Sequence, residues 1–504
     1  MDSVAVCYLV AFAILGAAWF FVKPHRAKIS LCLVIVLTVY VGSELRQMFV
    51  TKAIGKSTPV IEADRAELEL KFGSAMSAAM KKMGKLSPSD EKSLHKTITE
   101  ADDVLDKVCQ TNPANATLQA CRVVLKHQMN QPIAKPLEYL QHSDPMEGPA
   151  LAKDLSFAFS TTPQHDLKAA AVIEEDLNNR LPNGWYRTHA LGALYRVSEQ
   201  NEKLAALQKD ESEQDFWRFS KMVAVMSVVI LCGLAGAIII LVQLIFLGRN
   251  VTPPDQVHLI QAPAAYGFKT VYGVFVAWIA TLLTVSHAAM AMVQSFKLVH
   301  LGVMVAAIMT ALLYTLSNAP GLLYIYFCAL KPHGIKFLEG VKWRPRVGNL
   351  GPWRLVLIGL MTWMAAIPLV VVVFIIAVKC FGSQGSSNPI IALVMQSARS
   401  SNILAILIFY FTIGVLAPIC EESLFRGFLY SSLRRKFSVL PSMLISAILF
   451  AGAHLDAGGF LPLFVLGAIF AFVFERTKST LPSMVAHGLW NSGTFTLVLL
   501  LFGN

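Results

Sequence analysis

The sequence carries little charge. Asp, Glu, Lys and Arg make up 15% of the 504 residues, against about 25% in an ordinary soluble domain. Several apolar runs reach the roughly 20 residues that a helix needs to cross a bilayer. This composition excludes an ordinary soluble enzyme and predicts a polytopic membrane protein.

Acidic residues are scarcest in the second half of the chain. Residues 51–219 carry 21 Lys/Arg and 24 Asp/Glu, a net of −3, whereas the remainder carries 22 and 8, a net of +14. In a soluble protein the total of +11 would suggest nucleic acid. Here the basic loops follow the positive-inside rule, so we expect a lipid bilayer as the environment and no nucleic-acid partner.

Cysteines are few outside the apolar segments. Of eight, six lie in such segments and are expected to be small core residues: Cys7, Cys32, Cys232, Cys328, Cys380 and Cys420. The other two, Cys109 and Cys121, could form a disulfide if their region faces an oxidising compartment. Their spacing alone leaves this open, because it does not reveal the geometry that a disulfide requires.

The pattern of apolar and polar segments predicts an all-α fold, a polytopic transmembrane helical bundle of about 8–10 spans with an inserted soluble helical domain. Residues 1–50 form an N-terminal transmembrane hairpin, 51–219 the inserted domain, 220–395 further transmembrane helices and 396–504 a membrane core. Spans are expected at 222–247, 270–295, 299–330, 354–380, 402–420, 441–458, 460–475 and 481–502, with a break of the third at 318–321 as an open alternative.

The inserted domain reads as short helices separated by Pro and Asn. Helix starts are predicted at Ser87-Pro88 and at Asn112-Pro113, and a long helix from 183 that could continue into the next span. Tetratricopeptide-like hairpins and an irregular helical domain both remain open, since no strict 34-residue period is visible. We expect this domain to recruit a protein partner or substrate.

Four basic segments predict the orientation of the chain. They lie at 23–28, 331–354, 434–436 and 476–478, and alternate threading of ten spans places all four in the cytoplasm. Residues 51–219 then lie outside it, which suits a multi-pass protein of a bacterial inner membrane.

The adjacent acids Glu421 and Glu422 are the outlier, because they meet the end of an apolar run. A carboxylate within a membrane segment is costly and marks a functional site by default. Neighbouring residues on a helix point about 100° apart, so the two should have different partners. Arg426 lies four residues after Glu422 and can pair with it, which leaves Glu421 free to face another helix.

Further polar groups lie in apolar surroundings nearby. His454 follows Glu422 by 32 residues, and His487 follows His454 by 33, with Asn491 one turn later. Each interval fits one span and a connection, so neighbouring helices could bring these groups together around a water molecule. A histidine that only packs between helices, and an ion or proton pathway in a transporter, are the competing interpretations.

The order of these motifs resembles the CPBP family of intramembrane proteases. "EESLFR" matches E-E-x-x-x-R, "FAGAH" from Phe450 to His454 matches F-x-x-x-H, and "HGLWN" from His487 to Asn491 matches H-x-x-x-N. This family includes the type II CAAX prenyl endopeptidases and the lysostaphin-resistance-A-like proteins. The resemblance covers about 400–495 and does not account for residues 51–219.

The resemblance implies an intramembrane endopeptidase that hydrolyses a peptide bond of a membrane-associated protein. Glu421 would act as general base, and His454 would hold the water. His487 and Asn491 would donate to the oxyanion. Glu422 and Arg426 would shape the site, and Phe450 would support it.

The cofactor is a separate question, since members of the family are often called metalloproteases. Glu421, His454 and His487 could hold a divalent metal such as zinc. H-E-x-x-H is absent from the sequence, and we favour the metal-free version.

Two matters stay open at this stage. A non-catalytic scaffold or immunity protein on the same fold is the alternative function, with a transporter behind it. Straight helices that start at one depth would also place His454 about 20 Å and His487 about 9 Å along their spans, too far apart to meet.

Overall fold

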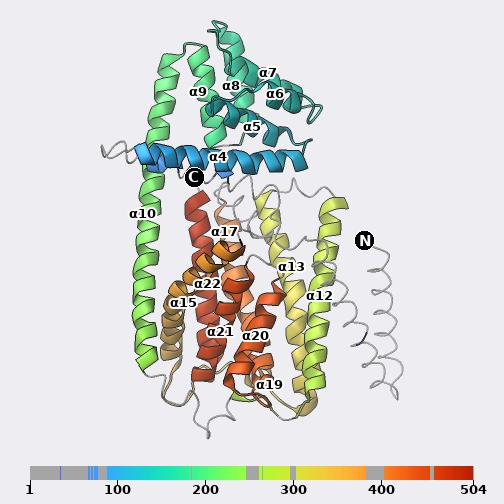
Figure 1. Cartoon of the computed structure of the whole chain (residues 1–504). Coiled ribbons are helices and arrows are strands. Elements are labelled where there is room, and N and C mark those ends of the chain that lie inside the picture. Colours follow the sequence, from blue (N-terminus) through green and yellow to red (C-terminus); the bar gives the residue numbers. More distant parts are fainter. Residues whose placement is uncertain are drawn as a thin grey trace. The chain divides into compact units, whose positions relative to one another are not determined.

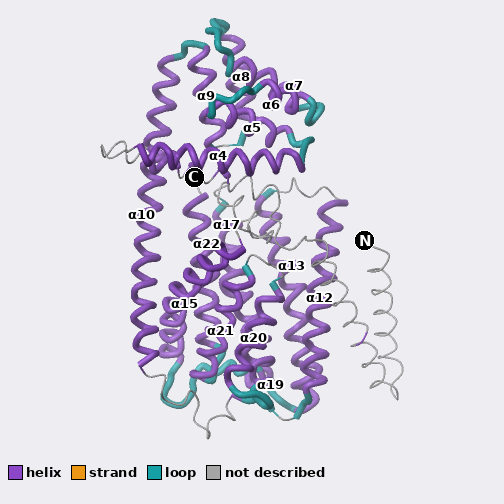
Figure 2. The backbone as a smooth tube through the Cα atoms, viewed as in Figure 1, coloured by secondary structure: helices purple, strands orange, loops and turns teal. Residues whose placement is uncertain are grey.

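A computed structural model describes Ile35, residues 66–67, 70–71 and 73–77, and then 88–182, 184–245, 260–263, 265–295, 302–381, 402–454 and 459–502. Among these residues the regular structure is helical, with one isolated antiparallel bridge between Val347 and Leu350 (Figures 1 and 2). The expected all-α class is therefore confirmed. The expected hairpin at 1–50 lies outside the described residues, Ile35 excepted.

The chain divides into two compact units. One comprises residues 57–227 with 500–502, and the other comprises 1–56, 228–499 and 503–504. The boundary between residues 227 and 228 falls within α10 (Asn201–Ile245). The first part of this helix therefore belongs to one unit and its second part to the other. Each unit is described separately below.

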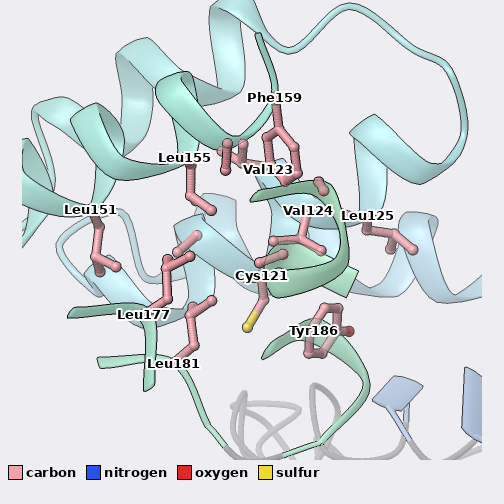
Figure 3. Close-up of a cluster of buried hydrophobic side chains, with 14 of the residues drawn as sticks. Cys121, Val123, Val124, Leu125, Leu151, Leu155, Phe159, Leu177, Leu181 and Tyr186 are labelled. Carbon is pink, nitrogen blue, oxygen red and sulfur yellow. The ribbon is translucent and has the colours of Figure 1, made fainter. Parts of the chain in front are cut away.

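The unit at 57–227 is built from a succession of short helices. They are α4 (Pro88–Thr111), α5 (Ala116–Gln128), α6 (Ala134–Gln141), α7 (Gly148–Ala158), α8 (Leu167–Arg180), α9 (Trp185–Val197) and the start of α10. Each contributes one apolar face to a common core, in which side chains of α5, α7 and α8 meet (Figure 3). Leu151, Leu155 and Leu177 lie in this core and are at most 1% exposed.

Two details of this unit differ from expectation. Asn115 caps α5 by accepting from the Leu118 N–H at 3.0 Å; the expected start at Asn112 is wrong, since the Asn112 amide donates to Val108 O and closes α4. The long helix from 183 is interrupted between α9 and α10, where Glu199 adopts a φ of 55°. Its second part does continue into an apolar span, as expected.

Cys109 and Cys121 are both buried free thiols in this unit, so the structure contains no disulfide between them. The Cys109 thiol lies 3.5 Å from Leu118 O and donates to it. Burial raises the pKa of Cys109 to about 12, which leaves the thiol protonated and unreactive at neutral pH.

The second unit contains the membrane helices. Six described helices are long and apolar enough to cross a bilayer: Asn201–Gln243, Phe268–Ala289, Val303–His333, Pro352–Cys380, Ile403–Leu433 and Phe460–Thr477. They correspond to the span of α10, α12 (Phe268–Ser295), α13 (Val303–Tyr324) with its extension, α15 (Pro352–Phe381), the segment at 403–433 and α21 (Phe460–Thr477). A shorter apolar helix, α20 (Val439–Ala453), and α22 (Leu481–Phe502) complete the unit (Figure 1).

Two expected span boundaries are wrong. The span predicted to end at residue 420 continues as one helical segment to Leu433, so the paired acids lie inside a helix. The predicted break at 318–321 is absent: α13 contains Pro320 and passes directly into the π-helix η4 (Ile325–Leu330). Neighbouring helices and side chains in a membrane unit can satisfy the groups that a proline frees.

Glycines bring α22 and the 403–433 segment into close contact. A Cβ atom on Gly488 would lie 2.5 Å from Gly414 O, a distance that forces a shift, and one on Gly414 would clash with Ser492 Oγ of α22. Gly427 packs directly against Val341 O, and a Cβ on Gly427 would clash with this oxygen. These close approaches fix the depth of α22 and of the 341–344 loop against the 403–433 segment.

Candidate active site

The acid pair lies between two widened helical turns. The segment runs as α17 (Ile403–Phe411), the π-helix η6 (Thr412–Leu416), α18 (Ala417–Glu422), the π-helix η7 (Ser423–Tyr430) and α19 (Ser431–Leu433). Every residue of η7 is buried. π-Helical turns within α-helices occur mostly at functional sites, and here one directly follows Glu422.

Glu422 is the centre of a buried ion pair. Its Oε1 lies 2.9 Å from Arg426 Nη1, and both side chains are fully buried. The same oxygen lies 3.0 Å from His487 Nδ1, and Arg426 Nη2 donates to Gly467 O at 2.9 Å. One carboxylate therefore links η7 to α22, and its guanidinium partner links η7 to α21.

Aromatic rings enclose the guanidinium. Arg426 Cζ lies 4.5 Å from the ring centroid of Phe450 and 5.3 Å from that of Phe470. Phe470 also stacks on the His487 ring, with centroids 5.1 Å apart. Phe450, which is 1% exposed, thus packs against the charged core of the site while its backbone oxygen contacts His454.

Glu421 points toward a different set of groups. Its Oε1 accepts a hydrogen bond of 2.9 Å from Tyr314 Oη. Its Oε2 lies 3.8 Å from His454 Nε2 and 3.8 Å from His487 Nε2. This oxygen is buried and has no hydrogen-bond partner within the described part of the chain.

The hydrogen bonds of the two histidines fix their proton-bearing atoms. His454 Nδ1 lies 2.8 Å from Phe450 O, an acceptor only, so Nδ1 carries a proton and Nε2 of the neutral ring is an acceptor. His487 Nδ1 likewise donates to Glu422. A separation of 3.8 Å between Glu421 Oε2 and His454 Nε2 is too long for a direct hydrogen bond but suits a bridging water.

The side chains around Glu421 differ in their solvent exposure. The His454 side chain is 29% exposed and that of Glu421 13%, whereas that of His487 is 4% exposed. His454 is therefore the most exposed side chain of the group, whereas Glu421 Oε2 is itself buried.

Asn491 occupies a position that the sequence did not predict. Its Nδ2 donates to Ile413 O at 2.9 Å, in the π-helix η6 that precedes the acid pair. One of its two N–H groups is thus used to hold α22 against η6.

The motifs predicted that His454 and His487 meet, and both imidazoles reach Glu421. The assumption of straight helices that start at one depth is therefore wrong. The turn before α22 is held by the protein, since the Thr480 N–H donates to Lys342 O at 3.1 Å.

The convergence of Glu421, His454 and His487 raises the question of a metal site. Among the residues that the structure describes, no group of three or more His, Cys, Asp or Glu has the arrangement of a metal site. Glu421, His454 and His487 converge, but their described geometry does not fit a three-ligand site.

Sequence reasoning missed Tyr314 and misread a second charged cluster. Tyr314 could have been found as a hydroxyl within an apolar span, since such groups need a partner. Glu475, expected to end a span beside Arg476, is fully buried. It accepts from Arg434 at 3.0 Å and from Tyr430 at 2.8 Å, so Arg434 is not a free basic residue of the loop.

The fold and the site define the class: a multi-pass membrane protein whose last helices enclose a glutamate–histidine cluster. Residues 403–493 match the family model described as type II CAAX prenyl endopeptidase Rce1-like. The resemblance seen in the motifs is therefore confirmed for this segment, which is that of a membrane-protease family.

Two curated proteins are similar to this chain. The "putative membrane peptidase YdiL" of Bacillus subtilis (strain 168) is 31% identical over 86 residues, 17% of this chain and 34% of the relative. The "UPF0177 protein YxdF" of Lactococcus lactis is 30% identical over 108 residues, 21% and 59% of the two. The chain thus spans about a third and about three fifths of these relatives. No solved structure matches it significantly.

Proposed function

We propose that the protein is an intramembrane endopeptidase in which Glu421 activates water. The observation that carries this proposal is the Oε2 atom of Glu421, buried without a hydrogen-bond partner in the described structure and 3.8 Å from two imidazole nitrogens. An oriented but unsatisfied carboxylate oxygen beside a neutral histidine is the arrangement that a general base for water requires.

The reaction uses one water molecule. The water donates one hydrogen bond to Glu421 Oε2 and one to His454 Nε2, so its lone pair is free for the carbonyl carbon of the peptide. As the new C–O bond forms, Glu421 accepts the proton. It then delivers this proton to the leaving amide nitrogen as the C–N bond breaks, which restores the carboxylate.

The oxyanion requires donors on the opposite side of the carbonyl. His487 can donate through Nε2 only when its ring carries both protons, because Nδ1 already donates to Glu422. An imidazolium at this position is balanced by the adjacent carboxylates. The second N–H of Asn491 is the other donor in the proposal, and donors of this kind contribute about 3–4 kcal/mol each.

The proposed mechanism runs without a metal ion. In support, no group of three or more His, Cys, Asp or Glu in the described part of the chain is arranged to hold one. Chelation of the purified protein tests this directly: we expect unchanged turnover, and loss that is restored by zinc alone would contradict it.

The substrate in this proposal is a membrane-associated protein or peptide, and the unit at 57–227 binds it or a partner protein. We also propose a bacterial inner membrane, with this unit outside the cytoplasm. Cysteine labelling in intact cells tests the orientation. Cys109 and Cys121 are buried, so the label belongs on Met146→Cys, at a side chain that is 88% exposed. Labelling only after the membrane is breached would contradict the orientation.

The decisive experiment compares membranes from cells that produce the wild type or Glu421→Gln at equal levels. New protein N-termini are measured by mass spectrometry. Glu339→Gln, the same change at an exposed acid of the short helix α14 (Phe337–Gly340), is the matched control. We expect N-termini that depend on the wild type and on the control but are lost with Glu421→Gln. Identical N-termini in all three would reject the protease and favour a non-catalytic scaffold or a transporter.

A further inference from the structure

We propose that Tyr314 is a positioning residue that holds the Glu421 carboxylate with Oε2 turned toward the water, an inference that rests on the proposed function. The Tyr314 hydroxyl is 2.9 Å from Glu421 Oε1 and comes from α13, 107 residues away in sequence. None of the three family-like motifs includes this helix.

The contact restricts the carboxylate in a specific way. A glutamate side chain has three rotatable bonds, and an unrestrained carboxylate would exchange its two oxygens. With Oε1 held by Tyr314, the free oxygen is the one that lies 3.8 Å from both imidazoles. The hydroxyl therefore selects which oxygen acts as base.

Among the described groups around Glu421, Tyr314 is the one that lies within hydrogen-bond distance of its carboxylate. Arg426 is paired with Glu422, and both histidines face Oε2 at 3.8 Å, beyond hydrogen-bond distance. Tyr314 is therefore the described group that orients the base.

The face of α13 that carries Tyr314 includes two further residues that bear on its packing. Asn318, four residues later, donates from Nδ2 to Tyr314 O at 3.1 Å within the same helix. Gly321, three residues further, allows α13 to approach α12 and η7, since a Cβ there would lie 2.7 Å from Trp278 and 3.1 Å from Leu424. The spacing i, i+4 and i+7 is one face of a helix, and this face lies against the segment of the acid pair.

The test is the split between kcat and KM for cleavage by the full-length protein in liposomes. The probe is a fluorogenic peptide that spans a site lost with Glu421→Gln in the membrane comparison. Tyr314→Phe should lower kcat about tenfold and leave KM close to that of the wild type. Tyr324→Phe is the control, because it removes another hydroxyl of α13, one that lies 3.0 Å from the Thr281 hydroxyl of α12; its kcat and KM should match those of the wild type.

A second measurement separates the possible failures. Stability is compared in a cycle of Tyr314→Phe, Glu421→Leu and the double variant, which needs no substrate; we expect the two changes to be non-additive. An unchanged kcat, or additive changes in stability, would overturn the role of Tyr314 and leave the protease intact. Equal cleavage of the probe by the wild type and Glu421→Gln would reject the proposed function instead, with the cycle still reporting on the contact.

Discussion

Arg426→Met is expected to destabilise the membrane unit strongly. The guanidinium is fully buried, and its removal leaves the fully buried Glu422 without its cation at 2.9 Å. Breaking a buried pair on one side costs about 3–5 kcal/mol, because an uncompensated charge remains. Gly467 O also loses its donor at 2.9 Å, and Phe450 loses a cation 4.5 Å from its ring. These losses overlap, so we expect about 4 kcal/mol in total.

The double variant Glu422→Leu/Arg426→Met distinguishes charge burial from packing. It removes both charges, and replacing a whole buried pair by apolar side chains is often nearly neutral. We therefore expect the double variant to be more stable than Arg426→Met, although inactive because His487 Nδ1 loses its acceptor. The assay is equilibrium unfolding in bicelles, with Arg354→Met, at an exposed side chain, as control. A double variant as unstable as the single one would refute the reasoning.

Two further predictions concern the packing of η7 and the unit at 57–227. Gly427→Ala should lower thermal stability by about 1–3 kcal/mol, because its Cβ would meet Val341 O; Gly452→Ala, with nothing within 4 Å, should be close to neutral. Burial, and then the nearby Asp176, raise the pKa of Asp154 to about 6. Between about pH 4 and pH 6 the folded state keeps a proton that the unfolded state releases, so stability falls as the pH rises. Asp154→Asn should remove this slope and add about 1–3 kcal/mol at pH 7, measured by hydrogen exchange of α7; an unchanged slope would contradict it.

The sequence was most informative where polar residues interrupt apolar runs. Helix periodicity and the spacing of the acid pair predicted the membrane class and the pairing of Glu422 with Arg426, now seen at 2.9 Å. The three motifs named Glu421, His454 and His487, which the structure brings together. Their catalytic roles remain predictions, because geometry alone does not measure turnover.

Other features depend on contacts that spacing along the chain does not encode. Tyr314 reaches Glu421 from a helix without a motif, and a tyrosine in an apolar span has no sequence feature that identifies its partner. The turn at 479–480 packs on the 342–344 loop through two hydrogen bonds, a contact that the spacing of the motifs does not predict. Asn115 rather than Asn112 caps α5, since either residue suits a cap and tertiary packing selects between them.

The π-helices on either side of the acid pair, η6 and η7, affect how this chain aligns with its relatives. A π-turn closes its hydrogen bonds one residue later than an α-turn, so it holds one residue more over the same rise. A relative with regular α-helix in place of η7 (Ser423–Tyr430) would be one residue shorter between its glutamate pair and the start of its next helix. An ungapped alignment of such a relative would shift every later motif by one position. The interval from Glu422 to His454 is therefore a structural marker, and a relative that shortens it by one residue should have lost the π-turn rather than the site.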